Sequence, residues 1–354
     1  MSFVTKIYNI SSPFVPLRLC AFVPLILLFT VAPAISEEIT VYSARMEQLI
    51  TPVFDAYTKS SGVKIRFITD KEGPLLQRLI AEGTDSPADL FMAVDAGMLW
   101  KAAEEKLLKP VASPTLSANI PSHLRDPKDR WFGLSVRART IVFNTKKVNP
   151  SGLSTYEALG DAQFQKRLCL RTSKKVYNQS LVAMMIADLG MEQTEKVVAS
   201  WVKNLAVDVF SDDTQVMKAI VEGICDLGIV NTYYYGRLME KRPDYPLSLF
   251  WPNQKDRGVH VNISGAGVTL HTKHEKAAIA FLEWLSSEKA QNLFADSNLE
   301  YPANPKVTPD KTVAKWGRFK QDLINVENAG KLQIEAVTPA PNERPIGPET
   351  PSWR

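Results

Sequence analysis

Three consecutive tyrosines at positions 233–235 are the residues of this chain whose type and spacing best suit chemistry. They follow the apolar run 224–230 and the pair Asn231 and Thr232, which are good helix N-cap residues. A buried strand is therefore expected to end here and a helix to begin, so that neighbouring side chains can converge on a cleft instead of alternating between two faces. Phenolate oxygen is a hard anionic ligand, and ferric iron is the leading candidate to bind two of them.

A metal site made of tyrosines has a clear physical basis. A free phenol has a pKa near 10, but a trivalent cation can displace its proton, as metals do with bound water and thiols. A helix N-terminus adds about 0.3–1 kcal/mol in favour of the phenolate. Copper and zinc prefer His or Cys, which are scarce here. Ordinary packing with one hydroxyl hydrogen bond is the competing interpretation, and the triplet alone favours packing.

Other signatures of chemistry are weak. His271 and His274 have the i, i+3 spacing that could bind zinc on a helix, but no third ligand has a suitable spacing, which favours a solvated surface pair. The chain has no G-x-S-x-G, P-loop or dinucleotide fingerprint. The net charge of +4 is mild, and no basic tract with interleaved aromatic residues supports nucleic-acid binding.

Residues 1–36 have the features of a secretory signal peptide. Lys6 and Arg18 precede an apolar stretch that is shorter than the ~20 residues needed to span a membrane, and Ala32-Pro33-Ala34 resembles a cleavage site. We therefore expect a periplasmic protein, cleaved near residues 34–36 and not membrane-spanning afterwards. Cys169 and Cys225 remain in the mature chain, where an oxidising compartment favours a disulfide between them. Two buried thiols that never meet are the alternative.

Strand-like and helix-like segments alternate from residue 38 onward, which predicts an α/β fold. The length of the mature chain suggests two domains. The expected strands are 38–42, 63–68, 88–93, 131–144 and 260–270, and the expected helices are 48–60, 74–82, 96–105 and 275–288. The long segment 131–144 would cross into a second lobe, from which 260–270 would return. Residues 337–354 are proline-rich and are expected to form a flexible end.

Seven short blocks along residues 38–332 resemble one protein family. They are Val41-Tyr42-Ser43-Ala44-Arg45, Ser86-Pro87-Ala88-Asp89-Leu90, Trp131-Phe132-Gly133-Leu134-Ser135-Val136-Arg137-Ala138-Arg139, Tyr177-Asn178-Gln179-Ser180-Leu181, Glu222-Gly223-Ile224-Cys225-Asp226, Asn231-Thr232-Tyr233-Tyr234-Tyr235-Gly236-Arg237 and Asn262-Ile263-Ser264-Gly265. The family is that of the ferric-iron-binding proteins of bacterial ABC importers, the Fbp/Fut/Idi branch of the periplasmic binding proteins. The Tyr-Tyr and Arg-Ala-Arg blocks together make the resemblance specific.

The resemblance implies a two-lobed type II periplasmic-binding-protein fold with a hinge and an interlobe cleft. The first lobe would comprise 37–135 and about 260–290, and the second 136–259 and about 291–336, before the tail 337–354. It also implies a monomeric solute receptor that catalyses no reaction and delivers Fe³⁺ to an ABC permease and its ATPase.

The resemblance places the iron ligands at Tyr177, Tyr233 and Tyr234. Three phenolates leave an octahedral ferric ion with open positions, which a carbonate-like synergistic anion could fill. A guanidinium holds a planar anion in its fork. Arg137 and Arg139 are the candidates, and because both point to one side of a strand, their spacing does not choose between them.

The first lobe departs from the family's pattern. Some relatives place a histidine soon after the Tyr-Ser-x-Arg block, whereas Met46 and Glu47 follow Arg45 here. Met46 is too soft for ferric iron. Glu47 or Glu72 could supply a carboxylate, although an acid at a helix start more often stabilises the helix dipole. Tyr42 could reach the site or be structural, so the tyrosines of the second lobe are expected to hold most of the iron.

Alternative functions remain open at this point. The nearest is a receptor of the same fold that captures an anion or a small organic solute directly and would not need the tyrosine pair. An exported metal-dependent hydrolase using His271 and His274 belongs to a different class, as does a partner-binding domain with no ligand.

Overall fold

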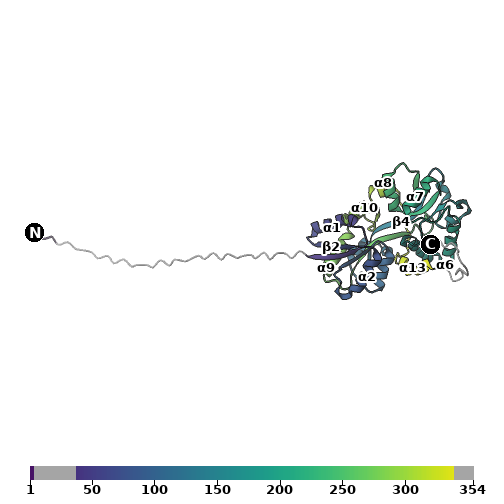
Figure 1. The fold of residues 1–354 in the computed structure, drawn as a ribbon. Helices are drawn as coiled ribbons and strands as arrows, with labels where there is room; N and C mark the ends of the chain where they lie inside the picture. The colour runs from purple at the N-terminus through teal and green to yellow at the C-terminus, as the bar shows by residue number, and fades with distance from the viewer. Residues whose placement is uncertain (4–36, 339–354) are drawn as a thin grey trace. The chain divides into compact units, whose positions relative to one another are not determined.

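The computed structural model describes residues 1–3 and 37–338, except the side chains of 295–297. Residues 37–338 belong to one α/β body (Figure 1). The expected signal peptide, apart from its first three residues, and residues 339–354 of the expected tail lie outside the described residues. Within the described part, no helix is both long and apolar enough to cross a bilayer.

A mixed sheet forms the centre of the described body. Its strands lie in the order β2 (Lys64–Thr69), β1 (Glu38–Ser43), β3 (Leu90–Ala93), β8 (Val261–Val268), β4 (Phe132–Asn144), β6 (Leu227–Asn231) and β5 (Leu168–Cys169), with β7 (Leu247–Phe250) and β9 (Tyr301–Pro302) paired to β4 off this path. The pairs β1–β2, β1–β3 and β5–β6 are parallel, and β8 and β4 run antiparallel to their neighbours. This is the α/β arrangement that the alternating segments predict.

Strand β4 joins the two ends of the sheet. Its residues up to Ala138 pair with β8, and from Arg139 onward they pair with β6. Every residue of β4 is buried, which explains its apolar, β-branched sequence, because a strand covered on both faces has no solvent-exposed positions to alternate. The expected crossover at 131–144 is thus one uninterrupted strand.

Helices flank the sheet at both ends. Figure 1 shows α1, α2 and α9 around β2, and α6, α7 and α8 beyond β4. The longer helices are α1 (Glu47–Ser61), α2 (Glu72–Glu82), α3 (Ala96–Glu104), α5 (Val176–Leu189), α6 (Met191–Lys203), α7 (Asp213–Glu222), α8 (Thr232–Lys241), α9 (Glu275–Leu285) and α10 (Glu288–Asn298). The shorter ones are α4 (Pro114–Asn119), α11 (Lys311–Ala314), α12 (Asn328–Lys331) and α13 (Gln333–Val337), with 3₁₀ turns at Gly83–Asp85, Ser122–Leu124, Pro150–Gly152, Glu157–Gly160 and Ala162–Phe164.

The hydrophobic core divides at β4. One large cluster contains the apolar side chains of β1, β3, β8 and α1, and two smaller clusters contain those of β6, α5, α6 and α7. Phe294, Leu299 and Val313 lie in the large cluster, although residues 291–336 are expected in the second lobe. The reason is that β9 pairs with the first part of β4, through Tyr301 opposite Val136. Leu332, Ala336 and Trp316 of this stretch pack against the second side, Trp316 through the ring of Tyr235.

A disulfide joins Cys169 and Cys225, with Cα atoms 5.9 Å apart. Cys169 ends β5, and Cys225 lies just before β6. Parallel pairing of β5 with β6, with Cys169 opposite Gly228, brings the two cysteines together. The bond lies in the core cluster that also contains residues of α7.

Candidate functional site

A cavity of about 240 Å³ contains all three tyrosines that the resemblance implicates. Its charged and phenolic lining residues are Arg45, Arg137, Tyr177, Tyr233, Tyr234, Arg237 and Glu300. These come from the β1–α1 connection, from β4, from the first turn of α5, from the first two turns of α8, and from the residue before β9. The cavity therefore brings together segments up to 255 residues apart in sequence.

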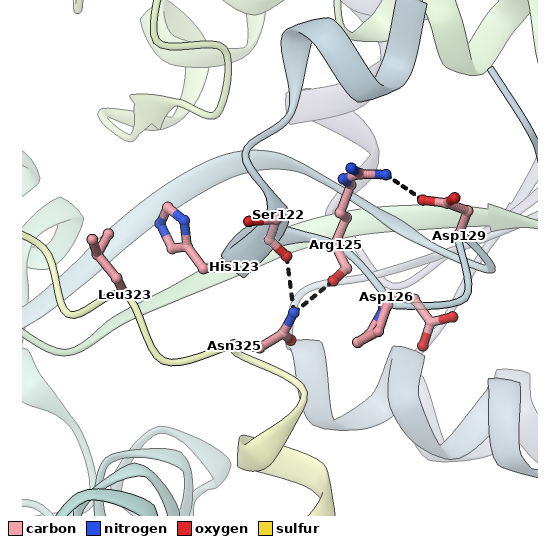
Figure 2. A pocket seen from close by; sticks show the side chains of 8 residues that line it. Ser122, His123, Arg125, Asp126, Asp129, Leu323 and Asn325 are labelled. Atoms are coloured by element: carbon pink, nitrogen blue, oxygen red, sulfur yellow. Dashed lines mark hydrogen bonds and ion pairs between the residues drawn. The ribbon is translucent and has the colours of Figure 1, made fainter. Parts of the chain in front are cut away.

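A larger cavity of about 330 Å³ lies elsewhere and is lined by Ser122, His123, Arg125, Asp126, Pro127, Asp129, Leu323 and Asn325. Figure 2 shows contacts among four of its polar residues, Ser122, Arg125, Asp129 and Asn325. Asn325 donates to the carbonyl oxygens of Ser122 and Arg125 at 2.9 Å each, and Arg125 is paired with Asp129. Because this lining contains no tyrosine, the smaller cavity is the better candidate site.

The tyrosines occupy two helix starts. Tyr177 is the second residue of α5, and Tyr233 and Tyr234 are the second and third residues of α8. The rings of Tyr233 and Tyr234 lie with centroids 4.5 Å apart, and the phenols of Tyr177 and Tyr233 are close enough to shift each other's pKa. Asn231 donates to the Tyr233 hydroxyl at 3.2 Å. Two helix N-termini thus face the same phenol oxygens, an arrangement that favours negative charge there.

Both Tyr177 and Tyr233 are neutral phenols at neutral pH. Burial raises the pKa of Tyr177 above its ordinary value, and the Arg137 guanidinium acts in the opposite direction. Burial, together with the neighbouring phenols of Tyr177 and Tyr234, raises the pKa of Tyr233 well above its ordinary value. A cation that binds these oxygens must therefore displace protons, which a trivalent ion does most readily.

Arg137 presents a free donor to the cavity. Its side chain is buried, and its Nη2 donates to Asp95 Oδ2 at 3.4 Å. Its Nη1 is buried and has no hydrogen-bond partner among the described residues. Asp95 also accepts from Ser180 at 3.0 Å and Asn262 at 2.8 Å. Arg137 therefore contributes one of three side-chain hydrogen bonds to this carboxylate, and its Nη1 is not used there.

Arg139 lies outside the cavity lining and is fully engaged. It donates to Asn178 Oδ1 at 2.9 Å, Asp213 Oδ2 at 3.1 Å and Asn231 Oδ1 at 3.3 Å. Asn178 follows Tyr177, and Asn231 precedes the other two tyrosines, so Arg139 ties the two helix starts together. Within β4, Arg137 lies opposite Asn262 of β8, whereas Arg139 lies opposite Asn231 of β6. This difference in partner strand distinguishes the two arginines, which their spacing in the sequence could not do.

We expect Arg139→Gln to lower the free energy of unfolding by about 3–5 kcal/mol, because it breaks a buried ion pair and leaves a buried carboxylate with fewer partners. Chemical denaturation measures the change. Arg242→Gln is the matched control, since the Arg242–Asp244 pair is exposed and its loss should leave the unfolding midpoint in place. Equal stability of the two variants would contradict the role of Arg139 in holding the starts of α5 and α8 together.

The first-lobe candidates contribute little to the cavity. Met46 lines it but is 50% exposed, and Glu47 is exposed at the start of α1. Glu72 accepts from the Val94 backbone N–H at 2.7 Å, and burial and the nearby Asp95 raise its pKa to about 7. Neither glutamate lines the cavity.

Tyr42 has a structural environment. Its hydroxyl donates to Glu82 at 2.8 Å, and the Arg78 guanidinium lies 5.0 Å from its ring centroid. Tyr42 does not line the cavity. Tyr235 is also directed elsewhere, because its hydroxyl donates to the Leu247 carbonyl at 3.3 Å and its ring packs on Trp316.

Three lining residues were not anticipated from the sequence. Arg45 donates to Ser264 at 2.6 Å, is paired with Glu300, and keeps a buried Nε without a partner among the described residues. Burial alone would raise the pKa of Glu300, but Arg45 and Arg137 hold it below its ordinary value. Arg237 lies 5.2 Å from the Tyr233 ring centroid. Its i, i+4 spacing from Tyr233 was a usable signal, whereas nothing in the sequence pointed to Glu300.

The two histidines of the hydrolase alternative lie apart from this cavity. His271 and His274 are exposed before α9, and His274 Nδ1 is 3.2 Å from Asp89 Oδ1. Over the described residues, no group of three or more His, Cys, Asp or Glu side chains is arranged to hold a metal.

Two α/β cores that share β4, with a polar cavity lined from both, define a two-lobed solute-binding protein. The chain belongs to the bacterial extracellular solute-binding protein family, whose model matches residues 85–320. Iron uptake protein A1 of Synechocystis sp. is 39% identical over 311 residues, covering 86% of each chain. Iron uptake protein A2 of the same organism is 40% identical over 314 residues, covering 86% of this chain and 89% of the relative.

Solved structures have the same fold. A Trichodesmium protein (IdiA, FutA) in complex with iron and citrate ligands superposes with a TM-score of 0.82 at 41% identity, covering 84% of this chain and 96% of that chain. A ferric iron-binding protein A of Mannheimia haemolytica in an open conformation gives a TM-score of 0.80 at 35% identity, covering 85% and 96%. The expected two-lobed periplasmic-binding-protein fold is confirmed.

Proposed function

We propose that this protein is an extracytoplasmic receptor that binds Fe³⁺ through the phenolates of Tyr177, Tyr233 and Tyr234. The observation that carries the proposal is the convergence of three phenol oxygens from two helix starts on one cavity. Hard anionic oxygens suit ferric iron better than softer metals. The relatives named as iron uptake proteins and the similar structure with bound iron support the same ligand.

A synergistic anion completes the site in this proposal. Three phenolates balance the charge of Fe³⁺, while Arg45, Arg137 and Arg237 against Glu300 leave an excess of two positive charges in the lining, 3 − 1 = 2. The Asp95 carboxylate behind Arg137 reduces this excess to one. A carbonate-like anion with one or two negative charges therefore fits, held by the free Nη1 of Arg137. The citrate in the Trichodesmium structure shows that a carboxylate ligand accompanies iron in that protein.

Export and transfer follow from the same proposal. The signal peptide would be cleaved near residues 34–36, and the mature monomer would work in the periplasm. There it would act as a receptor, not as an enzyme, and pass iron to an ABC permease driven by a cytoplasmic ATPase. Hinge closure over the metal would give the permease a form to recognise.

A ferric titration followed by visible absorbance tests the proposal. Phenolate-to-iron charge transfer should colour the mature protein with a one-to-one endpoint, and bicarbonate should sharpen that endpoint. A receptor for an anion or an organic solute would stay colourless. Loss of iron binding in a His271→Ala, His274→Ala variant would instead favour a histidine metal site.

We expect Arg137→Gln to weaken ferric binding by roughly 10–100-fold in bicarbonate, the usual effect of removing a residue that supports a metal ligand. In bicarbonate-free buffer, the loss should be smaller, since Arg137 then acts only through its charge beside the Tyr177 ring, 5.5 Å from the ring centroid. Asp95 keeps its hydrogen bonds from Ser180 and Asn262, so the fold should persist. Competition against a ferric chelator measures both affinities, and an undiminished bicarbonate effect would exclude Arg137 as the anion site.

A further inference from the structure

One further arginine, Arg171, lies against the rings of Tyr177 and Tyr234. Its guanidinium carbon is 5.2 Å from the Tyr177 ring centroid and 5.9 Å from that of Tyr234. The side chain is only 6% exposed and does not belong to the cavity lining. One buried cation thus contacts two candidate ligands that come from different helices.

Asp213 anchors Arg171 in this position. Its Oδ1 lies 3.4 Å from Arg171 Nη1, and its Oδ2 accepts from the Asn231 backbone N–H at 2.8 Å. On the other side, Asn178 donates to the Arg171 carbonyl oxygen at 2.6 Å. Arg171 is therefore connected both to the start of α5, which carries Tyr177, and to the start of α8, which carries Tyr234.

Arg171 can act on the tyrosines through its charge, but it cannot bind a metal itself. Arginine remains protonated in proteins and has no lone pair to offer a metal. It can stack on aromatic faces and donate to a phenolate oxygen. Ferric binding places negative charge on both phenol oxygens, and a buried cation within a few ångströms stabilises that charge more than an exposed one does.

We propose that Arg171 is a positioning residue of the ferric site, which orients Tyr177 and Tyr234 and stabilises their phenolate charge when iron is bound. The inference rests on the proposed function. Arg137 also lies 5.5 Å from the Tyr177 ring centroid, but Arg171 contacts the ring of Tyr234 as well.

The test compares Arg171→Gln, Arg171→Lys and native mature protein by ferric titration. Charge transfer moves an electron from phenolate to iron, so removing the nearby cation should make the transfer easier. Arg171→Gln is expected to shift the visible band to longer wavelength and to weaken ferric binding roughly tenfold, a typical effect of one buried cation–π contact. Arg171→Lys keeps the charge, so its band should stay at the native position and its affinity should be closer to native.

Arg125→Gln is the matched control, because Arg125 is a partly buried, ion-paired arginine far from the tyrosines. It should leave the band unchanged. If Arg171→Gln does not fold, Arg171→Met replaces it, because Met keeps an apolar stem in the buried position and leaves Asp213 paired with Arg139, and it should show the same shift. Native band and affinity in the folded Gln variant, or equal behaviour of the Gln and Lys variants, would overturn the inference. A native protein that stays colourless with iron would overturn the proposed function itself.

Discussion

Replacing Tyr233 and Tyr234 together by phenylalanine is expected to abolish the visible band of the ferric protein and to weaken ferric binding by far more than 100-fold. Removal of a residue that only supports a metal ligand already costs about 10–100-fold, and this variant removes two ligand oxygens. The rings remain, so the tilted pair, with centroids 4.5 Å apart, should still pack. Competition against a chelator and the absorbance spectrum measure the two effects.

Tyr235→Phe is the matched control for this variant. It removes a phenol oxygen from the adjacent position, but that oxygen donates to the Leu247 carbonyl and lies outside the cavity. We expect native colour and native affinity. A double variant of Tyr233 and Tyr234 that kept full colour would exclude the assigned ligands, and a colourless Tyr235 variant would show that the ligand pair is offset by one residue.

Ferric affinity is expected to fall by at least about 100-fold for each unit that the pH is lowered between 8 and 6. The pKa values of Tyr177 and Tyr233 are raised above the ordinary value near 10, so both phenols are protonated throughout this range. Iron binding must then release a proton from each, and metal affinity falls by about one log unit per released proton and pH unit. The sign is fixed: acid favours the free protein, and alkali favours the ferric form.

A pH-stat titration measures the released protons directly, with the iron presented as a chelate whose own protonation is known. At least two protons per ferric ion are expected from the protein. A ferric affinity independent of pH would mean that the metal is held by groups already ionised in the free protein, such as Glu300, and not by phenols. The Tyr235→Phe variant should release as many protons as the native protein.

The sequence could predict which tyrosines line the candidate cavity, because they lie in contiguous motifs. The helix start after the apolar run 224–230 is a local property, and the structure begins α8 at Thr232, as expected. The expected strand 131–144 is β4. By contrast, the choice between Arg137 and Arg139 depends on which neighbouring strand each residue faces, and no sequence spacing contains that information.

The residues that the sequence did not reveal were missed for a different reason, which is that their partners are distant in sequence. Arg45 and Glu300 are paired across 255 positions, and Arg171 reaches Tyr234 from another element of the fold. Such contacts arise from tertiary packing, so residue type and spacing could not reveal them. The same holds for Phe294, which lies in the first core because β9 pairs with β4.

The most direct test of the central claim is a crystal structure of the ferric-loaded protein with anomalous scattering recorded at the iron absorption edge. We predict one strong iron peak within bonding distance of the hydroxyl oxygens of Tyr177, Tyr233 and Tyr234, with anion density beside Arg137. A single peak at His271 and His274, or at any position that none of the three phenol oxygens contacts, would contradict the account.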